Sequence, residues 1–323
     1  MVICKVITIK EEIWIEKYRP KRLDEIIGQD LVIERLKAYV NSKDMPHLLF
    51  SGLPGVGKTA SAIALARELY GEDWIYNFTE LNASDDRGID VVRDKIKNFA
   101  KVSPIGQSEF KIIFLDEADA LTNDAQSALR RTMEIFHKNC RFIISCNYPS
   151  KIIEPIQSRC VVYRFKPLSK EATKEVIKKI IDKEKIDVKD DAIDAIFEIS
   201  EGDMRKAINV LQSAASLKKE INSEIIYAVE GSIKLDDIKK IFHLVLNGSF
   251  DQAREYLHQI LDEGVSAEEI IKGIHKGIHD LDIPIDKQLK IIDRLGETDF
   301  RITEGSNEKI QLDALLAYMF LEL

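Results

Sequence analysis

The chain has 323 residues, and single domains usually have about 100–200, so we expect two or three domains with cores of their own. No apolar run approaches the roughly 20 residues that a membrane helix needs, which argues against a membrane protein or a membrane partner. The formal net charge of −8 argues against a protein that coats nucleic acid by bulk charge, so any DNA contact must come from a local basic surface.

The N-terminal segment and the cysteines bear on where the protein works. Residues 1–10 are too short, and too interrupted by Lys5 and Lys10, to form a secretory signal. The four cysteines include no C-x-x-C pair, so neither a zinc ribbon nor a disulfide framework is indicated. We therefore expect a cytoplasmic protein, associated with the nucleoid in a prokaryote or nuclear in a eukaryote.

Between Leu48 and Gly202, short apolar runs alternate with segments of helical periodicity, which predicts an α/β domain with a mostly parallel sheet. The predicted strands are 48–50, 76–78, 112–115, 142–145 and 161–163. After Pro167 the strands stop and apolar residues recur at helical spacing, and beyond Gly231 the chain stays helical. The predicted domains are therefore an α/β domain over 1–165, a helical domain over 166–230, and a helical packing or assembly module over 231–323.

A phosphate-binding loop follows the first predicted strand. The pattern G-x-x-x-x-G-K-[ST] is matched by Gly52-Leu53-Pro54-Gly55-Val56-Gly57-Lys58-Thr59. An apolar strand precedes this segment and an Ala-rich helix follows it, which is the context that the motif requires. In such a loop the backbone N–H groups wrap a phosphate, Lys58 reaches the β and γ phosphates, and Thr59 offers its hydroxyl to Mg²⁺.

Polar side chains follow two further predicted strands. Asp116 and Glu117 end the run 112–115, and at the carboxyl edge of a parallel sheet they predict a Mg²⁺ ligand and a residue that polarises the attacking water. The alternative is a solvated acidic turn, which the neighbouring P-loop disfavours. Asn147 follows the run 142–145 and is predicted to orient the same water or touch the γ-phosphate; an ordinary turn residue is the alternative.

Two arginines are candidates for phosphate contacts. Arg205 falls in the first turn of a predicted helix capped by Asp203, where the helix dipole disfavours a cation unless an anion is bound. Pairing with Asp203 or Glu201 is the alternative. Arg159 precedes the last strand, and no motif brings it back to the phosphates of its own chain. It therefore either bonds helix-end carbonyls or acts as an arginine finger on the ATP of another subunit.

The motifs together resemble the successive boxes of replication factor C small subunits, in the order of that family and over the first two thirds of the chain. The boxes are Trp14-Ile15-Glu16-Lys17-Tyr18-Arg19-Pro20, the P-loop, Leu115-Asp116-Glu117-Ala118-Asp119, Ser158-Arg159-Cys160 and Gly202-Asp203-Met204-Arg205. The resemblance implies an α/β AAA+ P-loop domain with a parallel sheet, an all-α lid domain and an all-α C-terminal collar domain.

The resemblance also implies partners and an activity. Copies of this chain and a large replication factor C subunit would form a ring that uses ATP and Mg²⁺. The ring would open a sliding clamp similar to PCNA and close it around primer–template DNA, with ATP hydrolysis releasing the loader.

Residue roles carry over from the family motif by motif. Ile15, Arg19 and Ile27 would lie on the adenine side, Gly52 to Thr59 on the phosphates, and Asp116 with Glu117 at Mg²⁺ and water. Asn147 would be the first sensor, Arg205 the lid sensor and Arg159 the finger in trans. The family's central helix would be 123–136, a candidate for the clamp contact. Ordinary burial is the alternative for its residues at helical spacing, which are Gln126, Leu129, Met133 and Phe136.

A predicted helix over 89–99 offers the local basic surface. Its apolar face leaves Arg93 on a basic stripe, and Arg87 lies beside its N-terminus, where the dipole favours a phosphate. We expect Arg87 and Arg93 to contact the DNA backbone without reading bases. A plain solvated face, with Asp90 and Asp94 as pairing partners, is the alternative.

Two other functions compete with clamp loading. Another AAA+ motor, such as a branch-migration helicase or a remodelling ATPase, would share the nucleotide chemistry, although the helical pattern after Gly231 shows no hairpin of a winged DNA-binding domain. A scaffold that binds ATP without hydrolysing it would not need the carboxylate of Glu117.

Overall fold

The computed structural model describes residues 13–84, 89–106, 108–217 and 220–323, with the backbone alone described for 89–94. The chain divides into two compact units. The first unit contains the described residues up to Asp187 together with Ile196–Gln212, and the second contains Val188–Ala195 and Ser213–Leu323. Among the described residues, no helix is long and apolar enough to cross a membrane.

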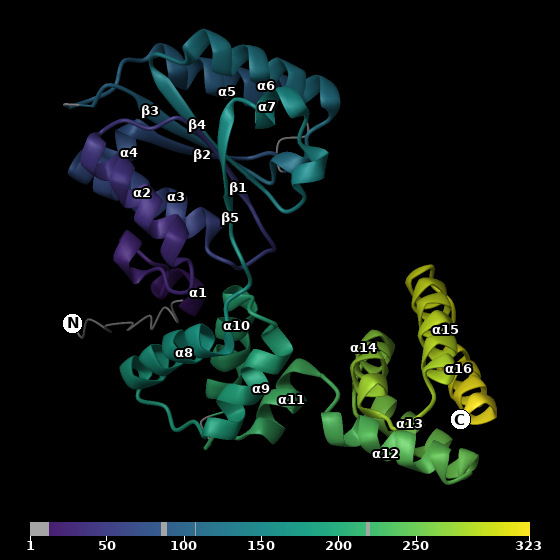
Figure 1. Ribbon diagram of the computed structural model, residues 1–323. Coiled ribbons are helices and arrows are strands. Elements are labelled where there is room, and N and C mark those ends of the chain that lie inside the picture. Colours follow the sequence, from purple (N-terminus) through teal and green to yellow (C-terminus); the bar gives the residue numbers. More distant parts are fainter. Residues whose placement is uncertain (1–12, 85–88, 107, 218–219) are drawn as a thin grey trace, which may run out of the picture. The chain divides into compact units, whose positions relative to one another are not determined.

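The first unit is built on one parallel sheet of five strands in the order β2-β3-β4-β1-β5 (Figure 1). The strands are β1 (His47–Ser51), β2 (Phe78–Asn82), β3 (Lys111–Asp116), β4 (Cys140–Cys146) and β5 (Cys160–Arg164). Because all strands run the same way, the P-loop and the residues that follow β3 and β4 meet at the carboxyl edge. The predicted α/β domain with a parallel sheet is confirmed.

One predicted strand is displaced along the chain. The apolar pattern predicted it at 76–78, whereas β2 begins at Phe78 and a helical turn, α4 (Trp74–Asn77), precedes it. The buried amide of Asn77 exchanges two hydrogen bonds of 2.9 Å with the backbone of Ile105, and this pairing holds the turn. Tyr76 was assigned to a buried strand because it is aromatic, but it is 59% exposed.

Helices cover both faces of the sheet (Figure 1). On one face lie α2 (Asp30–Ser42), α3 (Lys58–Tyr70) and α4, and on the other lie α5 (Ile89–Lys101), α6 (Asn123–Phe136) and α7 (Glu154–Gln157). Successive strand residues point to opposite faces, so Phe50 packs in the core under α2 and α3 while Leu49 packs in the core under α5 and α6. Each fully buried side chain of this size stabilises the fold by roughly 1.5–3 kcal/mol.

The periodic residues of α6 were predicted either to contact a clamp or to be buried in the fold. Gln126, Leu129 and Met133 are all buried, with exposed fractions of 1%, 6% and 1%, and Phe136 is half-buried against the same apolar cluster. Their spacing therefore reflects packing against the sheet, and these three side chains are not available to contact a clamp.

The remaining elements are helical, as predicted for the lid and collar regions. The first unit also holds α1 (Trp14–Lys17), α8 (Lys170–Glu184) and most of α10 (Met204–Ala215), whose last three residues belong to the second unit. The helix α9 (Asp190–Ser200) is likewise divided between the units. The second unit contains α11 (Ser223–Glu230), α12 (Leu235–Leu246), α13 (Phe250–Asp262), α14 (Ala267–Gly277), α15 (Ile285–Thr303) and α16 (Glu308–Glu322). Its helices α12 to α16 share an apolar cluster that includes Ile241, Phe242 and Leu315.

Candidate nucleotide-binding site

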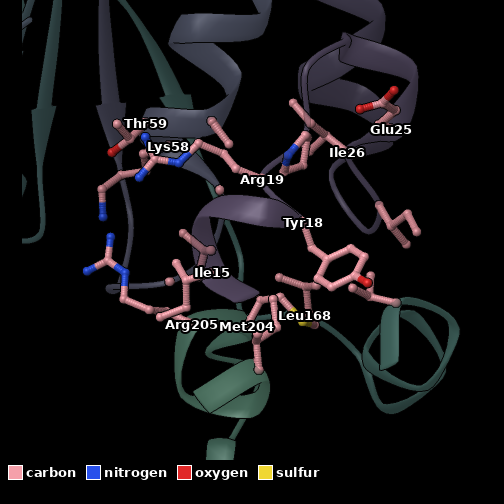
Figure 2. A pocket seen from close by; sticks show the side chains of 18 of the residues that line it. Ile15, Tyr18, Arg19, Glu25, Ile26, Lys58, Thr59, Leu168, Met204 and Arg205 are labelled. Atoms are coloured by element: carbon pink, nitrogen blue, oxygen red, sulfur yellow. The ribbon is translucent and has the colours of Figure 1, made fainter. Parts of the chain in front are cut away.

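A cavity of about 460 Å³ opens at the carboxyl edge of the sheet in the first unit (Figure 2). The P-loop, the ends of β3 and β4, and the helices α1, α8 and α10 all contribute to its walls. The predicted site residues on these walls are Ile15, Arg19, Ile27, Pro54, Gly55, Val56, Gly57, Lys58, Thr59, Asp116, Glu117, Asn147 and Arg205. Residues assigned to one site from motifs far apart in the sequence therefore line one cavity.

The P-loop glycines are required by close approaches as well as by backbone conformation. Gly55 has a φ of +68°, and a Cβ there would lie 1.7 Å from Oδ1 of Asp203. A Cβ on Gly52 would lie 2.5 Å from the carbonyl oxygen of Phe165. A side chain at Gly52 would push the loop away from the Phe165 backbone, and one at Gly55 would displace the Asp203 side chain.

Lys58 is anchored inside the loop that precedes it. Its Nζ donates to the carbonyl oxygens of Gly52 and Leu53, at 2.6 and 2.8 Å, and to Oδ1 of Asn147 at 2.9 Å. Asn147 comes within reach because β4 is the neighbour of β1 in the sheet. Burial lowers the pKa of the Lys58 ammonium, and the nearby Asp116 carboxylate opposes that shift. The ammonium group of Lys58 is thus held in a desolvated position. A phosphate bound beside it would interact with it more strongly than in water.

The candidate metal ligands touch one another. Thr59 Oγ1 donates to Asp116 Oδ2 at 2.8 Å, which joins the end of the P-loop to the end of β3. A hydroxyl and a carboxylate are oxygen ligands that suit Mg²⁺, which usually completes its shell with water and substrate phosphates. Within the described part of the chain no group of three or more His, Cys, Asp or Glu side chains could hold a metal.

Glu117 stands in an unusual backbone conformation. Its φ is +52°, in the left-handed region that residues with a side chain rarely adopt, and its N–H donates to Asp116 Oδ1 at 2.9 Å. Such strain costs on the order of 1–3 kcal/mol and persists where the surroundings hold it. This conformation places Glu117 on the cavity wall beside the pair formed by Thr59 and Asp116.

Arg205 reaches the cavity from the first turn of α10. The predicted cap of that helix is confirmed: Asp203 Oδ1 accepts from the backbone N–H groups of Arg205 and Lys206 at 2.8 and 3.0 Å. Its carboxylate therefore serves the helix terminus, and among the described residues Arg205 has no ion pair. Figure 2 shows the guanidinium of Arg205 facing the P-loop side that carries Lys58. Two cations directed at one space suit a polyphosphate.

One carboxylate in this arrangement was not predicted from the sequence. Asp119 Oδ2 accepts from the backbone N–H groups of Asn147 and Tyr148, each at 3.2 Å. These bonds fix the loop that presents Asn147 to Lys58. The available signal was a third acidic residue two positions after Glu117, but nothing in the sequence indicates that it reaches the loop after β4.

Arg159 is not part of the cavity wall. It precedes β5, at the amino edge of the sheet, and a five-residue strand separates that edge from the P-loop edge by about 16 Å. Its guanidinium pairs with Glu134 of α6 at 2.6 Å and donates to the carbonyl oxygen of Pro155 at 2.7 Å. The structure therefore separates Arg159 from the nucleotide residues of its own chain.

The candidate DNA residues remain predictions. Arg87 lies outside the described residues, and at Arg93 the backbone of α5 is described but the side chain is not.

Comparisons with known proteins add to this geometry. The family model for the ATPases associated with various cellular activities (AAA) matches residues 48–168, a model for the RCF1/5-like AAA+ ATPase lid domain matches 175–216, and the replication factor C C-terminal domain matches 233–318. The RuvB Holliday junction branch migration motor of Thermotoga maritima has a similar structure, with a TM-score of 0.55 at 22% identity over 71% of this chain and 79% of that one. At this identity the likeness concerns the fold alone.

Two curated relatives are much more similar in sequence. The replication factor C small subunit of Archaeoglobus fulgidus is 56% identical over 95% of this chain and 97% of its own length. That of Methanosarcina acetivorans is 57% identical over 97% of this chain and 96% of its own. With the AAA domain, the lid and the C-terminal domain matched in order, the chain belongs to the replication factor C small subunit family.

Proposed function

We propose that this chain is an ATP-hydrolysing subunit of a sliding-clamp loader. Several copies would assemble with a large replication factor C subunit, open a clamp similar to PCNA and load it onto primer–template DNA. The observation that carries the proposal is the linked pair of contacts Lys58–Asn147 and Thr59–Asp116, at the mouth of a cavity in a chain 56% identical to a replication factor C small subunit.

In the proposed site each group has a distinct task. The P-loop backbone from Gly52 to Thr59 and the Lys58 ammonium hold the phosphates, and Ile15, Arg19 and Ile27 border the adenine. Thr59 and Asp116 hold Mg²⁺, which when bound neutralises phosphate charge. Glu117 polarises the attacking water and Asn147 orients it. Arg205, which belongs to the lid, contacts the γ-phosphate and so makes the position of the lid depend on it. Arg159 acts on the ATP of a neighbouring subunit.

We also propose three modules with boundaries at 165/166 and 230/231. The three family matches, over 48–168, 175–216 and 233–318, support this division. The two compact units defined by contacts divide the chain differently, because part of α9 groups with the second unit. In the proposal the first module binds ATP, the second acts as lid and the third joins subunits.

Two substitutions test the nucleotide site in the assembled complex. Lys58→Ala should weaken ATP binding, because it removes the charge aimed at the phosphates, whereas Glu117→Gln should keep ATP binding and lose roughly 10²-fold or more in turnover. ATP binding is measured by equilibrium titration, and turnover by steady-state ATPase with and without primed DNA and clamp. Tight binding with normal turnover in the Lys58 variant would refute the assignment of the P-loop.

The same assay separates clamp loading from the competing functions. A clamp loader should be stimulated by primed DNA together with a clamp, and should transfer the clamp onto DNA. A branch-migration motor would respond to junction DNA and ignore the clamp. A nucleotide-gated scaffold would bind ATP with no turnover under any of these conditions.

The proposed DNA contacts have a test of their own. Replacing Arg87 and Arg93 with Ala should lower DNA-stimulated ATPase and flatten the salt dependence of DNA binding, by roughly one unit of slope for each phosphate that a subunit no longer neutralises. Basal ATPase should survive. Ala at Arg254 and Arg301, which removes the same charge from α13 and α15, is the matched control. An unchanged salt slope in the first double variant would leave α5 a plain solvated helix.

A further inference from the structure

A buried glutamine connects the P-loop to the segment that carries the lid. Gln29, immediately before α2, is 4% exposed. Its Nε2 donates to the carbonyl oxygen of Lys166 at 2.7 Å and to that of Val56 at 3.2 Å, and its Oε1 accepts from the N–H of Lys166 at 3.3 Å. The side-chain amide thus pairs with both backbone groups of Lys166, as a neighbouring strand would, and has one donor left for the P-loop.

Lys166 belongs to a short linker, residues 165–168, between β5 and Ser169, the N-cap of α8. Its first residue is fixed to the sheet, because Phe165 N–H donates to the Ser51 carbonyl at 2.8 Å. Its last residue is fixed to the turn before α10, because Leu168 N–H donates to the Gly202 carbonyl at 3.2 Å. A Cβ on Gly202 would lie 2.6 Å from the Leu168 carbonyl oxygen, so the linker and this turn are in close contact and only glycine fits between them. The linker therefore sets the position of both lid helices that border the cavity.

The P-loop contacts the lid at a second point. Met204 N–H, at the start of α10, donates to the Gly55 carbonyl at 3.2 Å. The next residue is Arg205, which faces the Lys58 side of the cavity (Figure 2). Gly55 is thus bonded directly to the start of α10. The next P-loop residue, Val56, is bonded through Gln29 to Lys166 in the linker before α8.

We propose that Gln29 is a positioning residue that couples the phosphate-binding loop to the lid, so that Arg205 is held opposite Lys58. Gln29 is not part of the cavity wall, and it acts through Val56 and Lys166. The inference rests on the proposed ATP site but not on clamp loading. Without Gln29, the buried Val56 carbonyl and the partly buried carbonyl and N–H of Lys166 lose a partner, and one of the two connections between the P-loop and the lid is lost.

The chain offers a matched control in Gln126 of α6. Its side chain is 1% exposed, and it also holds three backbone groups: the carbonyls of Leu121 and Lys151, at 3.2 and 2.9 Å, and the N–H of Ile153 at 2.8 Å. It too is not part of the wall of the nucleotide cavity. Gln29→Met and Gln126→Met therefore remove equivalent hydrogen bonds, with similar shape, from two junctions of which only one joins the P-loop to the lid.

The experiment measures ATP binding and thermal unfolding of the full chain carrying each substitution, alone and with Arg205→Ala. We expect both Met variants to unfold at lower temperature and only Gln29→Met to weaken ATP binding, by roughly 10-fold. Arg205→Ala should weaken binding in the wild type and in Gln126→Met but add little in Gln29→Met, because the arginine is already misplaced there. Equal ATP affinity of the two Met variants, or independent effects of Gln29 and Arg205, would overturn the proposal.

Hydrogen exchange of the wild-type chain provides a test that needs no variant. ATP should slow exchange of the Lys166 and Leu168 amides, and leave unchanged that of Ile153, the amide held by Gln126. If ATP binds and the linker amides do not respond, the coupling is refuted. If neither the wild type nor Gln126→Met binds ATP, the proposed ATP site itself fails, which is a separate outcome.

Discussion

The two edges of the parallel sheet carry comparable sets of ionisable residues but differ in what these residues contact. At the carboxyl edge Lys58, Asp116 and Glu117 border a cavity. At the amino edge, Arg141 donates to the carbonyls of Met45 and His137, and His47 accepts from the N–H of Phe142. Buried charge and a shifted pKa occur at both edges, so neither identifies a binding site without a cavity beside it.

Arg159 differs from the other charged residues of the amino edge because its side chain is accessible to a ligand. Arg159 keeps a side chain that is 38% exposed, and among the described residues it is held by Glu134 and by the carbonyl at Pro155. An exposed ion pair of this kind is worth about 0–1 kcal/mol, so another ligand can replace it at little cost. The carboxyl edge thus presents its cation to a cavity of the same chain, while the exposed cation of the amino edge is the one that we propose to act on a neighbouring subunit.

The largest expected effect is a loss of ATP turnover when Arg159 is replaced. Arg159→Ala in the assembled complex should bind ATP normally and lose on the order of 10³-fold or more in turnover, the usual contribution of an arginine finger. Mixed with a Glu117→Gln variant, it should regain activity at interfaces where one subunit supplies the finger and the other the carboxylate. Steady-state ATPase of the mixtures measures this. Mixed rings that form but remain as inactive as either parent would show that Arg159 does not act in trans.

The second effect concerns the half-buried His47 at the amino edge. Burial, with smaller contributions from the charges of Arg141 and His137, lowers the pKa of His47 to about 4. Above pH 6.5 His47 is neutral in both states; between pH 6.5 and 4 only the unfolded chain binds the proton. Stability is therefore complete above pH 6.5 and decreases as the pH falls toward 4, by up to about 3 kcal/mol.

Denaturant unfolding at pH 7.5 and pH 5 checks this, followed by tryptophan fluorescence, because Trp14 and Trp74 both lie in the first unit. His47→Gln, whose amide oxygen can accept the Phe142 N–H, should lose less stability between the two pH values than the wild type. His137→Gln, which removes only one of the smaller contributions to the His47 pKa, should change the pH dependence much less than His47→Gln. Equal pH dependence in His47→Gln and the wild type would contradict the expectation.

The smallest effect returns to the carboxyl edge. Asp119→Ala should reduce turnover by roughly 10-fold with little change in ATP affinity, because the loop that presents Asn147 loses two hydrogen bonds while the P-loop is untouched. Asp119→Asn keeps an acceptor oxygen and should restore most of the turnover. Single-turnover hydrolysis and equilibrium ATP binding separate the two quantities. A loss of affinity as large as the loss of turnover would mean that Asp119 supports the whole site rather than Asn147.

How far the sequence predicted this protein depends on the range of each interaction. The P-loop, the carboxylates after β3 and the cap by Asp203 are local patterns, since spacing along a strand end or a helix start fixes their geometry. The five strands were also predicted from local apolar runs. The one misplaced strand, β2, was displaced by a distant contact, the pairing of Asn77 with Ile105.

By itself, then, the sequence determined the order of elements and the chemistry available at each strand end, because helix and strand periodicity and turn residues act within a few positions. Only the tertiary structure decided which ends meet. The sheet order β2-β3-β4-β1-β5 brings Asn147 to Lys58 and leaves Arg159 at the far edge. Packing of the linker against the P-loop gave Gln29 its three backbone partners. These contacts join residues 27 to 137 positions apart, and no local pattern encodes them.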